Sequence, residues 1–239
     1  MKRALVTGAS GTLGAAIARH LAASGHHVYL HANTQLEKAE GLAAEIAVAG
    51  MRAQAVRFDL TSPEETRAAL EDMLQAGPIQ ILVNNAGIHD DAVMPGMRAE
   101  QWARVIDVSL NGFFNVTQPL LLPMLRTRWG RIVNISSIAA VMGNRGQANY
   151  AAAKAGLHGA TRTLCLELAS RGITVNTVAP GIISSPATAE LFPKEMLAKM
   201  VPMQRAGTPE EVAELVGFLA SEKAAYISGQ LLNINGGMT

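Results

Sequence analysis

The sequence has few residues that crosslink chains or stack on bases. Only one of its 239 residues is cysteine, Cys165, so neither an intramolecular disulfide nor a Cys-x-x-Cys site can form. Cys165 lies in an apolar run, which favours a buried, inert thiol. Two tryptophans, three tyrosines and five phenylalanines leave few rings to stack on nucleic-acid bases. We expect no metal centre and an aliphatic core.

An excess of one charge and a long apolar run are also absent. Lys plus Arg is 20 and Asp plus Glu is 19, so the net charge of +1 provides no general attraction to nucleic acid or an acidic membrane. No apolar stretch reaches the roughly 18 residues that span a bilayer. The first apolar run ends at Thr7-Gly8, which is short for a signal peptide. We therefore expect a cytoplasmic protein without nucleic-acid or membrane partners.

Apolar runs that predict strands alternate with stretches that have the periodicity of helices. Strands are expected at 3–7, 27–32, 53–58, 79–83, 131–135, 174–178 and 230–234. Helices are expected at 13–24, 36–49, 63–75, 99–125, 149–170 and 209–221. This alternation predicts one α/β domain over 1–239, with a doubly wound parallel sheet of about seven strands and helices on both faces. Residues 184–207 fit the pattern least and are predicted to form a lid over the site.

A glycine-rich turn joins the first strand to the first helix. Glycines allow a tight turn and a close approach to a pyrophosphate, and the helix N-terminus offers free N–H groups to the anion. A tight turn without a ligand is the alternative. The residues of this turn predicted to bind a dinucleotide cofactor are Gly8, Ser10, Gly11, Thr12, Leu13 and Gly14.

The end of the second strand bears on which nucleotide is preferred. An acid there would bind the ribose 2′-hydroxyl and repel a 2′-phosphate. Here the chain has His31, Ala32, Asn33 and Thr34, without an acid. Neutral hydrogen-bonding groups and a possible His31 cation favour NADP(H) over NAD(H), unless these residues only form a turn.

Ser137, Tyr150 and Lys154 form a set suited to carbonyl reduction, which needs a hydride at carbon and a proton at oxygen. Ser137 follows a strand, and Tyr150 and Lys154 share one face of a helix because they are four residues apart. A lysine cation about 4 Å away would favour the phenolate by about 4 kcal/mol at an effective dielectric of 20. We predict that Lys154 lowers the Tyr150 pKa towards neutrality, where a general acid works best, and that Ser137 orients the substrate oxygen.

These motifs together resemble the short-chain dehydrogenase/reductase family. The glycine turn, Asp59-Leu60, the segment 84–87, Ser137, Tyr150-x-x-x-Lys154 and Pro180-Gly181 stand in the family's order. The resemblance implies a Rossmann-like sheet and places Lys154 on the nicotinamide ribose. It also implies that further residues contact the cofactor: Asn33, Thr34, Asp59, Leu60, Asn85, Ala86, Gly87, Pro180, Gly181, Ile183 and Ser185.

Within the family, the chain looks most like bacterial reductases of 3-oxoacyl groups carried on acyl-carrier protein. The stretches 143–150, 169–176, 225–230 and 235–238 carry this likeness. It implies a homotetramer that reduces a β-keto thioester with NADPH in fatty acid or related biosynthesis. Arg128 and Arg171 match basic positions that receive the acidic carrier protein, although they could be ordinary surface charges.

Three positions depart from the family pattern. Thr12 replaces a glycine of the turn, and Gly11 stands where NADPH-dependent members often have arginine. Ser109 replaces a catalytic asparagine that holds a backbone kink and a proton-relaying water. Ser185 lies in Ser-Ser-Pro, where the family often has Glu-Thr-Asp, and can still supply a hydroxyl to the nicotinamide amide.

Two other functions share most of these features. A dehydrogenase of a free alcohol, steroid or sugar would have the same catalytic set and differ only in its pocket. A cofactor-binding sensor or inactive partner subunit would explain Thr12 and Ser109. The intact Ser137, Tyr150 and Lys154 favour an enzyme.

Overall fold

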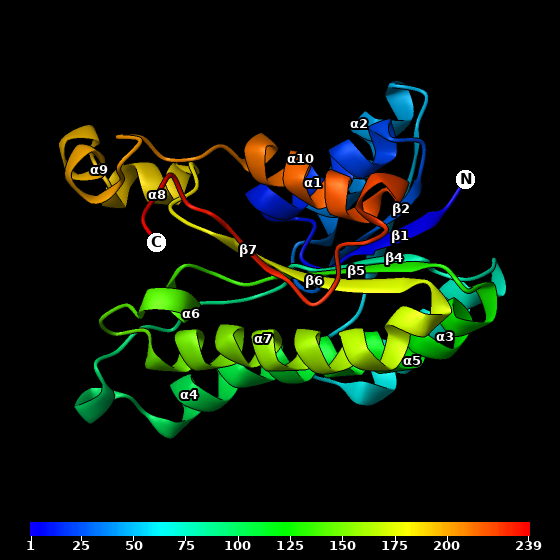
Figure 1. Cartoon of the computed structure of the whole chain (residues 1–239), viewed down its shortest axis with the longest axis horizontal. Coiled ribbons are helices and arrows are strands. Elements are labelled where there is room, and N and C mark those ends of the chain that lie inside the picture. Colours follow the sequence, from blue (N-terminus) through cyan, green and yellow to red (C-terminus); the bar gives the residue numbers. More distant parts are fainter.

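Seven strands form one continuous parallel sheet, as the alternation predicts (Figure 1). The computed structural model describes all residues from Met1 to Thr239. The strands lie in the order β3-β2-β1-β4-β5-β6-β7. The chain therefore reverses its direction of strand addition between β1 and β4, which opens a crevice at their carboxyl ends. The strands are β1 Arg3–Val6, β2 His27–Ala32, β3 Arg52–Arg57, β4 Ile81–Asn84, β5 Gly130–Ile135, β6 Ile173–Pro180 and β7 Leu231–Ile234.

Helices cover both faces of the sheet. In Figure 1, α1, α2 and α10 lie on one face, and α3, α5 and α7 lie on the other. The helices of the first face are α1 Thr12–Ala23, α2 Leu36–Val48 and α10 Pro209–Ala220, and those of the second are α3 Pro63–Gln75, α4 Ala99–Ile106, α5 Gly112–Thr127 and α7 Ala148–Leu168. None of the helices is both long and apolar enough to cross a membrane.

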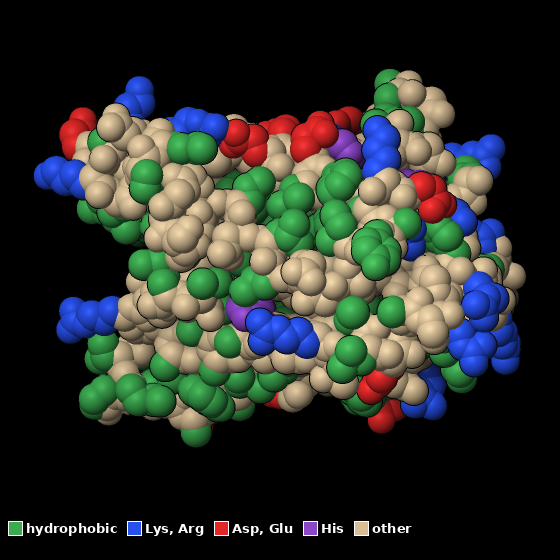
Figure 2. Space-filling view, viewed as in Figure 1, with side chains coloured by type: hydrophobic (Ala, Val, Ile, Leu, Met, Phe, Trp, Pro, Cys, Tyr) green, Lys and Arg blue, Asp and Glu red, His purple; other side chains and the backbone are tan.

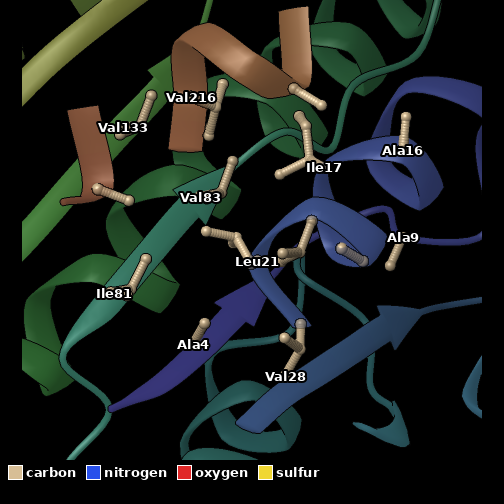
Figure 3. Packing of buried hydrophobic residues seen from close by; sticks show 14 of the residues in the cluster. Ala4, Ala9, Ala16, Ile17, Leu21, Val28, Ile81, Val83, Val133 and Val216 are labelled. Carbon is tan, nitrogen blue, oxygen red and sulfur yellow. The ribbon is translucent and has the colours of Figure 1, made fainter. Parts of the chain in front are cut away.

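The side chains of each strand alternate between two aliphatic cores. Ala4 and Val6 of β1 enter the core beneath α1 and α10, while Leu5 between them enters the core on the other face. This follows because successive side chains of a strand point to opposite faces. Figure 3 shows the first core, where Ile17 and Leu21 of α1 meet Val83 of β4. The doubly wound architecture is confirmed, and the core is largely aliphatic, as the composition predicts.

Sequence-coded caps start α3 and α10 where predicted. The Ser62 hydroxyl accepts a hydrogen bond from the Glu65 backbone N–H at 3.2 Å. Thr208 accepts in the same way from Glu211, whose carboxylate accepts from the Thr208 N–H at 2.7 Å. Such reciprocal bonds satisfy donors that a helix start otherwise leaves unpaired.

The long helix predicted over 99–125 is interrupted. A π-helical turn (η2, Asp107–Asn111) separates α4 from α5. A π turn takes in one more residue per turn than an α-helix, so it bends the helix and redirects nearby side chains. Gly112 follows the turn and packs closely on Leu60, where a Cβ atom would lie 3.0 Å from the leucine Cβ. The backbone irregularity thus occurs at Ser109, the position where the family resemblance implies a kink.

Residues 184–207 form two short helices beyond the edge of the sheet, α8 Pro186–Leu191 and α9 Lys194–Met200 (Figure 1). The four-residue α6, Ala139–Met142, is too short for periodicity to reveal it. Cys165 is only partly buried, so the predicted full burial of this thiol is wrong; its side chain lies beside Gly229.

Candidate active site

The carboxyl ends of β4, β5 and β6 open into a cleft of about 400 Å³. α6 and the start of α7 lie on one side, and α8 and α9 lie on the other; Figure 2 shows the surface indented at this end. The cleft contains many of the predicted site residues, because each follows a strand end. Those that line it are Leu13, Asn85, Gly87, Ser137, Tyr150, Lys154, Pro180, Gly181 and Ile183.

A second cleft of about 370 Å³ lies beside the carboxyl ends of β1, β2 and β3. Gly87 lines both clefts, so together they form one elongated site. The predicted cofactor residues that line the second cleft are Gly8, Ser10, Asn33, Thr34, Asp59, Leu60, Ala86 and Gly87. This division suits a dinucleotide, with its adenosine end in the second cleft and its reactive end beside Tyr150.

The glycine turn is held against the segment after β4. The Thr7 hydroxyl accepts hydrogen bonds from the backbone N–H groups of Asn85 and Ala86, each at 3.0 Å. The Asn85 amide donates to the carbonyls of Thr7 and Gly8 at 2.9 and 3.2 Å. The turn is therefore shaped by tertiary contacts as well as by its own glycines.

Two glycines of this turn are required by its geometry. Gly8 has a positive φ of 66°. A Cβ at Gly14 would overlap the Gly8 carbonyl oxygen and lie 2.8 Å from the Asn85 amide nitrogen. Gly11 caps α1 without a side-chain hydrogen bond, and no acid lies in the first turn. The first N–H groups of α1, including that of Thr12, are thus suited to an anion such as a pyrophosphate.

His31 does not supply a cation to the second cleft, and this part of the nucleotide prediction is wrong. Its ring is buried, and Nδ1 accepts a hydrogen bond from the Gly8 backbone N–H at 3.1 Å. Nε2 lies 2.9 Å from the Phe58 carbonyl, so Nε2 carries the proton and the ring is neutral. Burial lowers the His31 pKa to about 4. His31 instead fixes the glycine turn to β2.

Arg57 is a cation at the same place that is not among the predicted residues. It ends β3, the neighbour of β2, and its guanidinium Nε donates to the Asn33 carbonyl at 3.1 Å. Arg104 of α4 also lines the second cleft. Pairing β3 with β2 would have indicated Arg57 from the sequence, because parallel neighbours end at the same edge of a sheet.

Lys154 is buried beneath the floor of the catalytic cleft, with only 2% of its surface exposed. Its ammonium donates to the Ile135 carbonyl at 2.9 Å and lies 3.4 Å from that of Ala86. Gly87 makes room for it, since a Cβ there would lie 3.0 Å from Nζ. Burial lowers the Lys154 pKa to about 8, so the side chain is still mostly protonated at neutral pH.

The predicted lowering of the Tyr150 pKa is wrong for this structure. Burial raises the pKa of the phenol to about 12, and hydrogen bonding with Ser137 only partly opposes the shift. Lys154 Nζ lies 5.9 Å from the centre of the Tyr150 ring and is committed to backbone carbonyls. At neutral pH, Tyr150 is therefore protonated and able to donate a proton.

Ser109 lies inside the π turn, against Gly87 and Lys154. It is 3% exposed, and its hydroxyl has no hydrogen-bond partner within the chain. It borders a cavity of about 10 Å³, close to the least space that holds one water molecule. A Cβ at Gly87 would lie 3.5 Å from Ser109 Oγ and 3.0 Å from Lys154 Nζ. Asn111, two residues later, instead bonds Asp107 at the surface.

Restoring asparagine at this position is expected to keep or raise kcat. An asparagine amide adds a donor and an acceptor and can extend into the small cavity beside Ser109. We expect Ser109→Asn to leave cofactor affinity within about twofold, with Ser109→Ala as the control that only removes the hydroxyl. Steady-state kinetics and a melting curve test this. A large fall in both kcat and stability in Ser109→Asn would instead indicate overpacking, which typically costs about 1–3 kcal/mol.

Ser185, Arg128 and Arg171 are among the predicted residues that line neither cleft. The Ser185 hydroxyl caps α8 by accepting from the Thr188 N–H at 3.1 Å, and Thr188 lines the catalytic cleft in its place. Arg128 and Arg171 are exposed neighbours, and Arg128 donates to the Ser170 carbonyl at 3.2 Å. Arg171 follows the 21-residue α7 that begins beside Tyr150, so the pair lies about 30 Å from the phenol.

Comparison with known proteins agrees with this geometry. The family model described as short chain dehydrogenase matches residues 2–196. The chain therefore belongs to the short-chain dehydrogenase family, and it is an oxidoreductase that uses a nicotinamide cofactor.

Its curated relatives include proteins named 3-oxoacyl-[acyl-carrier-protein] reductase. Those of Staphylococcus epidermidis and Pseudomonas aeruginosa are each 44% identical over 240 residues. These alignments cover 99% of this chain, and 98% and 97% of the respective relatives. The relative from Aggregatibacter actinomycetemcomitans is 43% identical over 236 residues, covering 98% of both chains.

Proposed function

We propose that this protein reduces 3-oxoacyl thioesters to 3-hydroxyacyl thioesters with NADPH, as the names of its relatives indicate for those proteins. The observation that carries the proposal is a single cleft that combines Ser137, Tyr150 and Lys154 with an apolar wall. The apolar side chains of this wall include Ile138, Met142, Phe192, Met200 and Met238.

The apolar wall favours an acyl substrate over a sugar. Sugars need many hydrogen-bonding partners, and burying their hydroxyls against methionine and phenylalanine would leave those hydroxyls unpaired. Phe192 and Met200 come from the segment 184–207, which supports its role as a lid over the acyl chain. Methionine side chains adapt to irregular apolar surfaces, which suits acyl chains of different lengths.

The residues of the cleft can perform the protonation that accompanies hydride transfer. A bound nicotinamide cofactor supplies the hydride to the ketone carbon. The Ser137 hydroxyl donates a hydrogen bond to the ketone oxygen, and the Tyr150 hydroxyl gives that oxygen a proton. The phenolate left behind is stabilised by the Lys154 ammonium, which the Ile135 carbonyl holds in place.

A substrate panel tests the proposed reaction. NADPH oxidation is followed with acetoacetyl thioesters, simple ketones, steroid ketones and sugars. We expect kcat/KM to be highest for the thioesters. A sugar or steroid turned over more efficiently than every thioester would contradict the proposal.

We propose that NADPH is preferred over NADH, because no acid follows β2 at Asn33 and Thr34 and the Arg57 cation lies beside them. Asn33→Asp should place a carboxylate where the 2′-phosphate binds and pair with Arg57. We expect kcat/KM for NADPH to fall at least about 100-fold and the preference to reverse. Asn33→Ala, which adds no charge, is the matched control and should keep the preference. Equal kcat/KM for both cofactors in the unmodified protein would contradict this account.

We propose that the substrate is presented on acyl-carrier protein and that Arg128 and Arg171 receive that acidic partner. Because these arginines lie about 30 Å from Tyr150 along α7, a docked carrier must span that distance or serve the cleft of a neighbouring subunit. Reversing both to glutamate should raise KM for carrier-bound substrate about tenfold, more at low salt, because exposed charges are screened. A small thioester should be unaffected. Equal changes for both substrates would mean that the arginines only support the fold.

We also propose a homotetramer. Large apolar side chains are exposed on α5 and α7, including Phe114, Leu122 and Leu166, the last of which is 84% exposed. Figure 2 shows further hydrophobic side chains across the face that carries α7 and α10. Apolar surface of this extent is typical of faces that are covered by another subunit.

A further inference from the structure

His89 is a polar group of the catalytic cleft that has no role in the proposed hydride and proton transfer. It lies two residues after Gly87 and lines the same cleft as Ser137 and Tyr150. Its ring centre is 4.1 Å from that of Tyr150, with the two planes inclined by 33°. The side chain is 57% exposed, so it contacts the phenol on one side and the open cleft on the other.

The neighbours of His89 fix which of its nitrogens carries the proton. The Gln147 carbonyl oxygen accepts from the Asn144 amide at 2.9 Å, so the Gln147 amide hydrogens face the other way. They point to Asp91 Oδ2 at 2.8 Å and to His89 Nδ1 at 3.2 Å. Nδ1 therefore accepts, and the hydrogen of the neutral ring is on Nε2.

The ring is neutral under ordinary conditions. Partial desolvation against the Tyr150 ring lowers the His89 pKa; the Asp91 carboxylate raises it and the Lys154 ammonium lowers it, and the net effect is a lowering. The Nε2–H group is thus a neutral donor, and no group of the chain accepts from it.

Other side-chain donors on the walls of this cleft are already engaged within the protein. The Asn85 amide donates to the carbonyls of the glycine turn, and the Thr188 hydroxyl donates to the Ile183 carbonyl at 2.7 Å. The two Gln147 amide hydrogens are used by Asp91 and His89. The Asn144 amide uses one of its two hydrogens on Gln147. Beside the Ser137 and Tyr150 hydroxyls, His89 is the donor that packs against the Tyr150 ring and has no acceptor within the protein.

A 3-oxoacyl thioester has a second polar oxygen to satisfy. Its ketone and thioester carbonyls are separated by one methylene group, so the second oxygen lies close to the one held by Ser137 and Tyr150. An acceptor that loses water without gaining a donor costs binding energy. We propose that the His89 Nε2–H group donates a hydrogen bond to the thioester carbonyl and so selects β-keto thioesters over simple ketones. This rests on the proposed function.

Two variants separate the donor from the ring. His89→Phe keeps an aromatic ring against Tyr150 but has no N–H group, whereas His89→Gln keeps a donor and loses the ring. The substrates are acetoacetyl-N-acetylcysteamine and cyclohexanone, which has a single carbonyl. Melting curves and cofactor titrations accompany the kinetics and should show no change, because His89 is exposed and lies outside the glycine turn.

We expect His89→Phe to lower kcat/KM for the thioester by about tenfold or more, as loss of one donor to a desolvated carbonyl implies. His89→Gln should stay within about threefold of the unmodified protein, and both variants should reduce cyclohexanone at nearly normal efficiency. Parallel losses on both substrates would overturn the proposal, since His89 would then act only by packing on Tyr150. Unchanged thioester kinetics in His89→Phe, or equal losses in both variants, would overturn it too.

Different results would reject the proposed thioester reduction and the proposed role of His89. An unmodified protein that reduces cyclohexanone but no thioester would reject the proposed function, and the assignment of His89 with it. If the unmodified protein reduces the thioester alone, the comparison of His89→Phe with His89→Gln still decides the role of His89.

Discussion

Replacing Tyr150 with phenylalanine should lower carbonyl reduction at least about 100-fold while cofactor binding is retained. The substitution removes only the hydroxyl, and the ring can keep its contact with His89. The Tyr150 pKa of about 12 keeps the phenol protonated throughout the neutral range, which is the form that a reduction requires. Without the Tyr150 hydroxyl, the proton must come from water that has no fixed position near the ketone oxygen.

The matched control is Tyr226→Phe, which removes a hydroxyl from a fully exposed tyrosine. It should leave kcat and cofactor affinity unchanged. Cofactor binding is measured by titration, and reduction by steady-state and single-turnover kinetics. Near-normal turnover in Tyr150→Phe would reject the proposed mechanism, whatever the effect on KM.

Replacing Lys154 with methionine is expected to have a comparable effect on activity. Methionine keeps an unbranched chain of similar length but removes the ammonium that stabilises the phenolate, so kcat should fall at least about 100-fold. Cofactor affinity should fall as well if Lys154 contacts the nicotinamide ribose, as the family resemblance implies. Lys199→Met, at an exposed position of α9, is the control and should change neither kcat nor cofactor affinity.

The free energy of unfolding of Lys154→Met should also depend on pH. Burial lowers the Lys154 pKa from 10.5 to about 8, so the charged form is disfavoured in the folded state. Below pH 8, Lys154 is protonated in both the folded and the unfolded protein, so desolvation of its ammonium destabilises the folded protein. Between pH 8 and 10.5 the unfolded protein binds more protons than the folded one, and the free energy of unfolding rises with pH. The cost is about 3 kcal/mol at neutral pH, reduced by the bond to Ile135.

The stability of Lys154→Met relative to the unmodified protein should therefore be most favourable near pH 7 and decline as the pH approaches 10.5. Denaturant unfolding of both proteins at pH 7 and pH 10 measures this difference, with Lys199→Met correcting for groups that titrate in every variant. A pH-independent difference would mean that Lys154 is not desolvated as the structure indicates.

The strands and much of the site could be predicted because their signals are local or follow from strand ends. Most strands are apolar runs, and α3 and α10 begin at caps encoded within four residues. Ser137 and the segment 84–87 follow strand ends, and parallel strands bring such ends to one edge. The structure therefore gathers these residues although about 50 positions separate them in the chain.

The errors concern environments that the chain creates only when folded. His31 follows the expected strand, but its burial between Gly8 and Phe58 makes it neutral. Spacing placed Lys154 near Tyr150, but it could not show that backbone carbonyls hold the ammonium or that burial raises the phenol pKa. The π turn at Ser109 precedes a close packing of Gly112 on Leu60, and helical periodicity reveals neither feature.

Arg57 and His89 illustrate a further limit. Neither belongs to a motif, and each acquires its position from a partner distant in sequence: Asn33 in one case, Gln147 and Tyr150 in the other. Arg57 would have been indicated only by pairing β3 with β2, which the structure shows. The proton on His89 Nε2 could be deduced only from a chain of hydrogen bonds that includes Asn144 and Asp91.

The most direct test of the central claim follows the hydride itself. The unmodified protein is given acetoacetyl thioester with NADPH in which both C4 hydrogens are deuterium, and the product is analysed by mass spectrometry. We expect 3-hydroxybutyryl thioester with one deuterium at C3, formed by the unmodified protein and nearly absent with Tyr150→Phe. A product without deuterium, or no thioester reduction by a protein that readily oxidises the same cofactor with a sugar or a steroid, would contradict it.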